Sequence, residues 1–339
     1  MHIERGEKMS KLKSQMTESE LLKIYRDMAL IREFEERTAE MYSRGKITGF
    51  CHLYIGEEAV AVGAMKALHA EDYVVSSYRD HGHCLMKGTS AKEVMAELFG
   101  RATGICKGKG GSMHLFDPGK NFLGGYAIVA GELPIALGVG YSVKYRKEDK
   151  VVACFFGDGA TNAGAFYESV NMAKLWSLPI IFICENNFFG ISTAVSWASA
   201  TTDIFKKAEA HGIPSEKVNG MDVMAVWEAS RRGAKHARDG KGPYFIEALT
   251  YRFRGHSMSD PADYRIPREE KIWKDRDPIP NFARKLIEEG ISDADGLRAI
   301  KEEVEQEVEQ AVKFADSSPW PEAIELFKDI YSEKEGDER

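Results

Sequence analysis

Two short polar sequences, each at the end of an apolar stretch, could together bind a cation. Gly157-Asp158-Gly159 comes directly after VVACFF, and Asn186-Asn187 follows IIFICE. The Asp158 carboxylate offers one hard oxygen and the Asn187 amide offers a second, and Mg²⁺ prefers such ligands. A nearby backbone carbonyl, that of Phe189, and water molecules could complete an octahedron. The sequence therefore predicts a cation held by Asp158, Asn187 and Phe189.

The glycines beside Asp158 indicate what the cation would hold. Gly157 and Gly159 allow a sharp turn and a close approach to a ligand, and free N–H groups at a helix start attract an anion. A diphosphate bridged by Mg²⁺ fits both features. Either motif alone is more typical of a turn or loop, whereas both together, separated by a helix and a strand, are specific. GDGATN lacks the third glycine of GxGxxG, and the sequence contains no GxxxxGK[ST].

The elements that must position these residues alternate between strands and helices. Segments 151–156, 180–185 and 243–253 are predicted strands, and 163–176 and 222–238 are predicted helices. Apolar strands without alternation, separated by helices, are typical of a parallel sheet covered on both faces. Ligands bind at the carboxyl ends of such strands. We therefore expect an α/β fold whose site lies at that edge of the sheet.

The remaining segments suggest how the domain is bounded. Residues 1–16 read as a disordered or extended tail, and Thr17 then opens the capping box T-E-S-E of a long amphipathic helix. Residues 45–130, rich in glycine and aromatic residues, read as loops and short helices more than as regular sheet. We expect one α/β domain over 17–270 and a helical extension over 271–339 that packs on it.

Composition excludes several classes of protein. The chain has 339 residues, 43% hydrophobic content and a net charge of −7 without a basic block, which argues against binding to nucleic acid or an anionic membrane. The sequence shows no signal peptide and no run of 18 apolar residues; Met9 is an alternative start. Five cysteines without CxxC spacing favour reduced thiols and a cytoplasmic location: Cys51, Cys84, Cys106, Cys154 and Cys184.

With these motifs in view, the chain resembles the alpha subunits of the thiamine-diphosphate-dependent 2-oxo acid dehydrogenases, most closely the pyruvate enzymes. The resemblance covers about residues 20 to 330. It implies the thiamine-diphosphate-binding fold, with thiamine diphosphate and Mg²⁺ as cofactors. Five stretches carry it: FCHLYIGEEA (50–59), SSYRDHGH (76–83), GKGGSMHLFD (108–117), GDGATNAGAFYESVNMAKLWSLPIIFICENNFFGIST (157–193) and YRFRGHSMSDPADYR (251–265).

The resemblance assigns roles to matching positions. Asp158, Asn187 and the carbonyl of Phe189 would bind Mg²⁺, as the residue types already suggest. Ala127 departs from the family pattern, because the pyruvate enzymes usually have glycine at this position. The positions implied to contact the cofactor are Tyr78, Arg79, Ala127, Val129, Asp158, Gly159, Ala160, Asn187, Phe189 and His256.

Two histidines are implied to serve catalysis, and each has a plain structural alternative. His52 would face the substrate, but a histidine between aromatic residues is also typical of a hydrogen-bonded core position. His256 would lie at the diphosphate end, although it also suits a solvated loop. Arg79 would meet a phosphate, or it could form an ion pair with Asp80. Ser257 matches a position that is phosphorylated in animal relatives.

The resemblance also implies partners. In related enzymes a glutamate from a second domain activates the aminopyrimidine ring, and this sequence shows only one parallel-sheet domain. We therefore expect a beta subunit, an alpha₂beta₂ heterotetramer and a lipoyl-bearing dihydrolipoyl acyltransferase core, with the chain inactive alone. Pyruvate is the expected 2-oxo acid. Acetoin dehydrogenase and branched-chain 2-oxo acid dehydrogenase subunits remain alternatives, as does a non-catalytic scaffold subunit.

Overall fold

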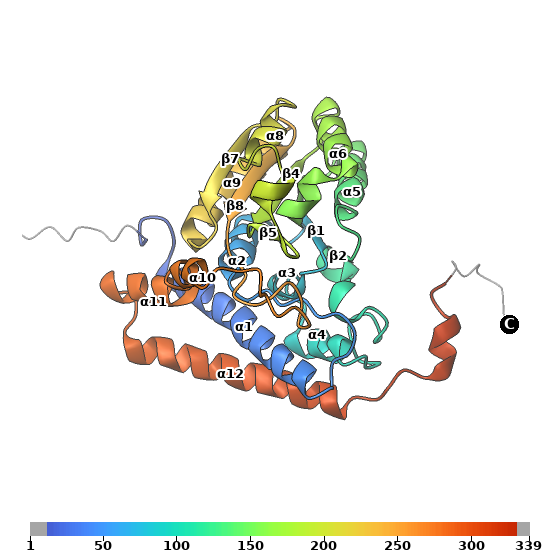
Figure 1. The fold of residues 1–339 in the computed structure, drawn as a ribbon, viewed down its shortest axis with the longest axis vertical. Helices are drawn as coiled ribbons and strands as arrows, with labels where there is room; N and C mark the ends of the chain where they lie inside the picture. The colour runs from blue at the N-terminus through green and yellow to red at the C-terminus, as the bar shows by residue number, and fades with distance from the viewer. Residues whose placement is uncertain (1–11, 331–339) are drawn as a thin grey trace, which may run out of the picture.

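A six-stranded sheet, parallel throughout, forms the centre of the molecule in a computed structural model that describes residues 12–330 (Figure 1). Its strand order is β2-β1-β3-β4-β8-β7, and β5 and β6 form a separate antiparallel pair. The expected α/β fold with a parallel sheet is therefore confirmed. The strands are β1 (Tyr73–Ser77), β2 (Phe122–Tyr126), β3 (Val152–Gly157), β4 (Ile180–Asn186), β5 (Phe189–Gly190), β6 (Thr193–Ala194), β7 (Ser215–Asn219) and β8 (Tyr244–Leu249).

Helices cover both faces of the sheet because its strands carry apolar side chains on both sides. Cys154 and Phe156 of β3 pack with residues of α5 and α6, whereas Phe155 packs on the opposite face with residues of α2 and α9. This two-sided burial explains the unbroken apolar strands. The helices between the N-terminal helix and the C-terminal helices, which are described below, are α2 (Glu58–Ala67), α3 (His81–Met86), α4 (Ala91–Leu98), α5 (Glu132–Arg146), α6 (Gly164–Leu175), α7 (Val195–Ala198), α8 (Phe205–Glu209) and α9 (Val223–Arg238).

Two strands lie where the sequence predicted loops and short helices. Both β1 and β2 fall within 45–130, and β1 occupies a central place between β2 and β3. In β1, Val74 and Val75 are fully buried, so tertiary packing gives a five-residue strand to a segment with weak local signals. The same region also contains the helices α2, α3 and α4 and two short 3₁₀ turns, Gly111–Met113 and Pro118–Lys120.

Strand β8 is shorter than predicted. It ends at Leu249 rather than at residue 253, because the following backbone leaves the sheet. The N–H of Phe253 donates to the carbonyl of Ile55 at 2.9 Å, which draws this segment toward the loop before α2. The segment after β8 thus becomes part of the molecule's ligand-facing edge.

A long helix begins where the capping box predicted it. Helix α1 spans Glu18–Ser43, the Thr17 side chain accepts from the backbone N–H of Glu20, and the Glu20 side chain bonds back to the Thr17 backbone. Most of the predicted tail, residues 1–11 with Met9, lies outside the described residues. Its described end is packed, since Leu12 and Met16 are buried in a cluster with α1 residues.

The C-terminal part is helical and packs along α1 (Figure 1). Asp277 separates two of its helices and caps the second through the N–H of Ile279. The last described segment is a 3₁₀ turn, Ala323–Phe327, and residues 331–339 are not described. Within 12–330, no helix is long and apolar enough to cross a membrane. The three helices are α10 (Pro267–Lys274), α11 (Pro278–Glu288) and α12 (Ala294–Ser317).

Candidate active site

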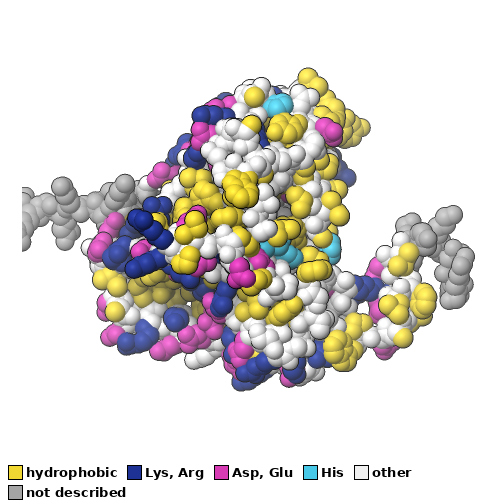
Figure 2. Space-filling view, viewed as in Figure 1, with side chains coloured by type: hydrophobic (Ala, Val, Ile, Leu, Met, Phe, Trp, Pro, Cys, Tyr) yellow, Lys and Arg dark blue, Asp and Glu magenta, His cyan; other side chains and the backbone are white. Residues whose placement is uncertain are grey.

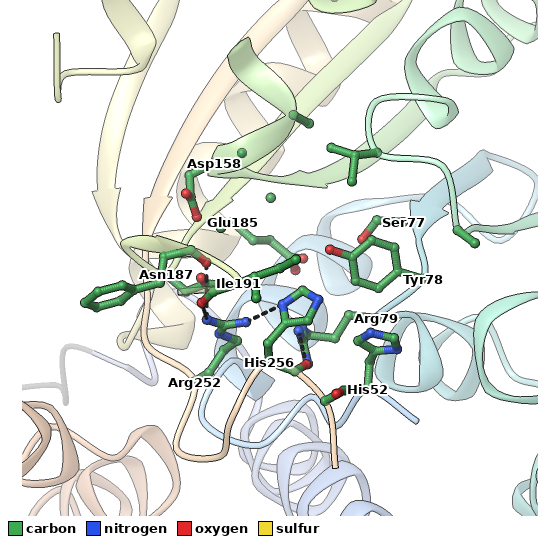
Figure 3. A pocket seen from close by; sticks show the side chains of 18 of the residues that line it. His52, Ser77, Tyr78, Arg79, Asp158, Glu185, Asn187, Ile191, Arg252 and His256 are labelled. Atoms are coloured by element: carbon green, nitrogen blue, oxygen red, sulfur yellow. Dashed lines mark hydrogen bonds between the residues drawn. The ribbon is translucent and has the colours of Figure 1, made fainter. Parts of the chain in front are cut away.

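A cavity of about 680 Å³ lies at the carboxyl ends of β1, β3 and β4 (Figure 3). Strand order reverses between β1 and β3, because β2 lies on one side of β1 and β3 and β4 lie on the other. Ligands of parallel α/β sheets bind at such a switch point. Every site residue predicted from the sequence lines this cavity: His52, Tyr78, Arg79, Ala127, Val129, Asp158, Gly159, Ala160, Asn187, Phe189 and His256.

The predicted cation ligands converge because β3 and β4 are neighbours and end in register, with Gly157 opposite Glu185. Asp158 is buried, and burial raises the pKa of its carboxyl group to about 6. The Asn187 side chain donates from Nδ2 to a Glu57 carboxylate oxygen at 3.1 Å. Its Oδ1 is buried and has no hydrogen-bond partner among the described residues. One desolvated carboxylate and one orphaned amide oxygen fit a hard cation.

The third predicted ligand, the carbonyl of Phe189, lies in the two-residue strand β5. It accepts a hydrogen bond from Nη2 of Arg252 at 3.2 Å, and a carbonyl oxygen retains a second lone pair. Phe188 and Ile191 flank this position with φ angles of 71° and 55°, which are unusual for such side chains. The searched residues contain no group of three or more His, Cys, Asp or Glu side chains suited to a metal. A cation here would therefore depend on mixed oxygen ligands.

The end of the cavity that was predicted to bind an anion differs from the prediction in one respect. The residues after Asp158 form a 3₁₀ turn, Asp158–Asn162, and α6 begins only at Gly164. The N–H groups of Gly159 and Ala160 belong to the first turn, where a helix leaves its N–H groups without partners of its own. An added Cβ on Gly159 would lie 3.8 Å from Cα of Gly190, so the two glycines pass each other closely.

Arg79 is anchored in the cavity wall by three groups. It donates to the carbonyls of Leu53 and His256, both at 2.7 Å, and its Nε lies 3.7 Å from a Glu57 carboxylate oxygen. Its ion-pair partner is thus Glu57 and not its neighbour Asp80, which was the alternative expected from sequence. This anchoring connects the end of β1 to the loops at Leu53 and His256.

His52, Tyr78 and His256 form a ring cluster on one wall. The His52 ring lies 4.6 Å from that of Tyr78 and 5.0 Å from that of His256, measured between centroids. Burial, with nearby arginines, lowers the pKa of His52 to about 2 and that of His256 to about 3. Both imidazoles are therefore neutral near pH 7. Nδ1 of His52 is buried without a hydrogen-bond partner among the described residues.

Arg252 determines the tautomer of His256. Nη1 of Arg252 lies 2.8 Å from Nδ1 of His256, and arginine can only donate, so Nδ1 accepts and Nε2 carries the proton. The same guanidinium contacts the carbonyls of Phe189 and Ile191. It therefore connects the His256 loop to the turn that holds a predicted cation ligand (Figure 3).

The predicted contacts at Ala127 and Val129 lie at the mouth of the cavity. Ala127 is half-buried, Val129 is 53% exposed, and its neighbour Ile128 is 75% exposed. They form the turn between β2 and α5, in which the N–H of Gly131 donates to the carbonyl of Ile128. Apolar side chains thus face outward at this rim.

Sequence reasoning missed several charged residues of the site, among them Arg252, Glu57 and Glu132. Arg252 is 1% exposed, and Glu57 is fully buried between Arg79 and Asn187. Glu132 is 1% exposed, and neither of its carboxylate oxygens has a hydrogen-bond partner among the described residues. Burial raises the pKa of Glu57 to about 7 and that of Glu132 to about 8. The only local signal in the sequence that could have indicated these residues was a charged side chain among apolar neighbours, such as Glu132 in GGYAIVAGELP.

Comparisons with known proteins cover nearly the whole chain. The model of the dehydrogenase E1 component family matches residues 26–324. The chain is 47% identical over 325 residues to "Pyruvate dehydrogenase E1 component subunit alpha" of Porphyra purpurea, covering 94% of each protein. It is 50% identical over 310 residues to the protein so named in Rhizobium meliloti (strain 1021), covering 91% of this chain and 89% of the relative. The chain therefore belongs to the dehydrogenase E1 component family.

Proposed function

We propose that this chain is the alpha subunit of a pyruvate dehydrogenase E1 component, an oxidoreductase that uses thiamine diphosphate and Mg²⁺. With a beta subunit it decarboxylates pyruvate and transfers the acetyl group to a lipoyl group of the acyltransferase core. The lipoyl disulfide is the electron acceptor and is reduced to an acetylated dithiol. The observation that carries this proposal is the cavity at the sheet's switch point, where Asp158 and the orphaned oxygen of Asn187 converge.

The donor set of the cavity suits Mg²⁺ held jointly by protein and diphosphate. Asp158, Asn187 and the Phe189 carbonyl would hold Mg²⁺ through three oxygens, the ligand type that this cation prefers. A cation would also compensate the buried carboxylate of Asp158. Glu57, by accepting from Nδ2 of Asn187, keeps the amide oxygen free for the metal.

Thiamine diphosphate, when bound, supplies the carbon that adds to the 2-oxo group and takes up the electrons left when CO₂ departs. The chain's own residues anchor and orient it. The N–H groups of Gly159 and Ala160, the Tyr78 hydroxyl and the Arg79 guanidinium suit the diphosphate. Ala127 and Val129 would contact the organic rings through the backbone at the cavity mouth.

The histidine cluster would act on the substrate side through neutral imidazoles. His256 can offer its Nε2 proton as a hydrogen bond, because Arg252 occupies Nδ1. His52 has a free Nδ1 that can accept or hold a proton. Two adjacent neutral rings avoid mutual charge repulsion, and they leave the arginines as the positive groups that attract anionic ligands.

The active site would be completed by the beta subunit. The described chain contains one parallel sheet, and its cavity opens beside the exposed Ile128 and Val129. A carboxylate that holds the pyrimidine nitrogen would come from the partner, as the family resemblance implies. Glu132 is a competing source, because it is a cavity-lining carboxylate with no bond of its own.

The test compares the chain alone and with its beta subunit, supplied with thiamine diphosphate, Mg²⁺ and an artificial electron acceptor. We expect pyruvate turnover only by the pair, with slower turnover of branched-chain 2-oxo acids and acetoin. Turnover by the chain alone, abolished by Glu132→Gln, would instead place the activating carboxylate within this subunit.

The same assay separates the remaining alternatives. Preferred turnover of acetoin or of a branched-chain acid would replace pyruvate as the substrate. A cofactor-loaded pair without activity on any of these substrates would support a scaffold role.

A further inference from the structure

A buried glutamate, histidine and serine lie next to the His52 segment of the cavity wall, and none of the three lines the cavity itself. Glu35 belongs to α1, His81 begins α3, and Ser112 belongs to a 3₁₀ turn. Oε2 of Glu35 lies 2.9 Å from Nδ1 of His81, and Oγ of Ser112 lies 2.8 Å from Nε2 of the same ring. Glu35 and His81 are fully buried, and Ser112 is 6% exposed. We call these three residues the buried triad.

The hydrogen bonds of the buried triad favour a positioning role over a nucleophilic one. Burial opposes the charged form of His81, but the Glu35 carboxylate outweighs this effect and raises the pKa of the ring. A protonated imidazole donates from both nitrogens, so Nδ1 donates to Glu35 and Nε2 donates to Ser112. A ring that already holds both protons cannot take the proton of the serine hydroxyl. Ser112 therefore acts as an acceptor.

The buried triad holds two backbone N–H groups of segment 51–55, which carries His52. The N–H of His52 donates to Oγ of Ser112 at 3.3 Å. The N–H of Tyr54 donates to Oε1 of Glu35 at 2.8 Å. Each end of the triad thus fixes one residue of this segment, and His81 joins the two ends by bonding to both.

The carbonyl groups of the same segment are bonded to other parts of the molecule. Three bonds join the carbonyls of Cys51, Leu53 and Ile55 to the N–H of Met258, the Arg79 guanidinium and the N–H of Phe253. Nδ1 of His52 has no hydrogen-bond partner among the described residues. The backbone bonds and the ring contacts with Tyr78 and His256 therefore determine where the His52 ring lies. A shift of segment 51–55 would move that ring within the cavity.

The turn that carries Ser112 is itself anchored by a second buried carboxylate, Glu97 of α4. Glu97 is fully buried, and its two oxygens accept four backbone N–H groups at 2.7–3.1 Å, those of Cys106, Gly108, Gly110 and Gly111. Successive backbone N–H groups around an anion are typical of phosphate-binding loops, and here the chain's own carboxylate occupies them. The glycine-rich sequence KGKGG (107–111) is thus committed to an internal anion and holds Ser112 in place.

We propose that Ser112, oriented by His81 and Glu35, is a positioning residue that keeps His52 at the substrate side of the cavity. This inference rests on the proposed function, because that function assigns His52 to the substrate. It adds a residue outside the cavity on which the placement of that histidine depends. It also gives the glycine-rich turn a role in catalysis that acts through His52.

The first test measures how well His52 is protected and needs neither cofactor nor substrate. Diethyl pyrocarbonate modifies accessible neutral imidazoles, and His52, which is 5% exposed, should react slowly. The full chain is treated, and the modification rate of His52 is divided by that of the exposed His69 in the same digest. Figure 2 shows histidine side chains only as small patches on one face, which keeps competing targets few there. Ser112→Ala should raise the ratio at least about fivefold, because segment 51–55 loses an anchor and opens more often.

The matched control is Ser230→Ala, the same substitution at a buried serine of α9. The Ser230 hydroxyl has no hydrogen-bond partner among the described residues, so its loss should leave the His52 ratio unchanged. Both variants should melt near the wild-type temperature. In Ser112→Ala, Nε2 of His81 keeps the backbone carbonyl of residue 112, at 3.2 Å, as its acceptor.

The second test measures turnover by the assembled pair. Ser112→Ala should lower kcat for pyruvate at least about tenfold, because a small misplacement of a catalytic group is costly. The concentration of thiamine diphosphate needed for half-maximal activity should change less than about twofold, since the buried triad does not contact Asp158 or Asn187. Ser112→Thr keeps the hydroxyl and should restore most of the wild-type kcat.

Unchanged His52 reactivity in Ser112→Ala would overturn the inference. Equal losses of kcat in Ser112→Ala and Ser112→Thr would also overturn it, since the hydroxyl would then be irrelevant. These outcomes are separable from failure of the proposed function. A wild-type pair without turnover of pyruvate would contradict the function alone, because the His52 ratio is measured without substrate. An active pair in which Ser112→Ala matches the wild type in both tests would contradict the inference alone.

Discussion

Carboxylates occur in two contrasting settings in this molecule. Along α12 they are exposed and paired with nearby cations: Glu305 lies 3.5 Å from Lys301, and Glu309 lies 3.5 Å from Lys313. Around the cavity, Glu57 and Glu132 are buried, and their pKa values are raised by desolvation. The paired set is complete in the isolated chain, whereas in the buried set Glu132 has no hydrogen-bond partner among the described residues and Glu57 is compensated only in part, by Arg79 and Asn187.

This difference separates a solvated surface from a binding site. An exposed ion pair contributes little to stability, because water screens each charge well. A buried carboxylate without full compensation lowers stability, and it is retained at a position where a ligand can supply the missing charge or proton. The following predictions test that contrast, starting with the carboxylate whose loss should matter most.

Asp158→Ala should abolish Mg²⁺-dependent binding of thiamine diphosphate to the assembled pair. We expect the affinity to fall by at least about 100-fold, since loss of an outer-sphere partner alone costs about 10–100-fold. Because the change removes a buried carboxylate, the chain itself should remain folded. Calorimetric titration of cofactor with and without Mg²⁺ measures the effect, and circular dichroism checks folding. Retained Mg²⁺-dependent affinity would refute Asp158 as a ligand.

Glu57→Ala should weaken Mg²⁺ binding by about 10-fold, because Asn187 then loses the acceptor that orients its amide. Glu57→Gln keeps an oxygen for Nδ2 of Asn187 and should recover most of the affinity. The measurement is the Mg²⁺ concentration needed for half-maximal cofactor binding. Equal loss in both variants would assign the effect to the Arg79 ion pair instead of the amide orientation.

Glu132→Gln should stabilise the isolated chain at pH 8.5 more than at pH 5. Burial raises the folded-state pKa of Glu132 to about 8 from its usual value of 4.5, so the native chain holds the proton that the unfolded chain releases in this interval. Wild-type stability therefore falls as pH rises from about 4.5 to 8. Thermal unfolding at both pH values measures the difference. If the unfolding temperatures of the variant and the wild type differed by the same amount at both pH values, the result would contradict this titration of Glu132.

Glu302→Gln on α12 should have the smallest effect. Its carboxylate lies 3.9 Å from Nε of Arg298, and both side chains are more than 60% exposed. We expect the free energy of unfolding to change by less than about 0.5 kcal/mol, with cofactor binding unchanged. Urea unfolding is the suitable measurement. A loss of cofactor affinity comparable to that expected for Asp158→Ala or Glu57→Ala would remove the contrast between the two settings.

The features visible in the sequence were those in which local pattern and tertiary structure agree. The β3 and β4 segments were apolar throughout, and the polar residues after them had to meet because neighbouring parallel strands end at one edge. The capping box at Thr17 located the start of α1 for the same reason.

Other features depend on packing that a local pattern does not contain. Strand β2, FLGGY, contains two glycines, and its place at the sheet edge follows from pairing with β1. Arg252 lines the cavity and Glu57 bonds to the cavity-lining Asn187, although the two charged residues lie far apart in the chain and come together only after folding.

The all-parallel pairing of the main sheet has a consequence for how the chain folds. Tyr73 lies opposite Val152, and Ile181 lies opposite Tyr244, so each ladder joins segments separated by long stretches of sequence. Loops of this length must close before their contacts become favourable, and folding rates fall as contacts become less local. We therefore expect slow folding, with apolar strand edges transiently exposed, so that aggregation competes with the native state during synthesis.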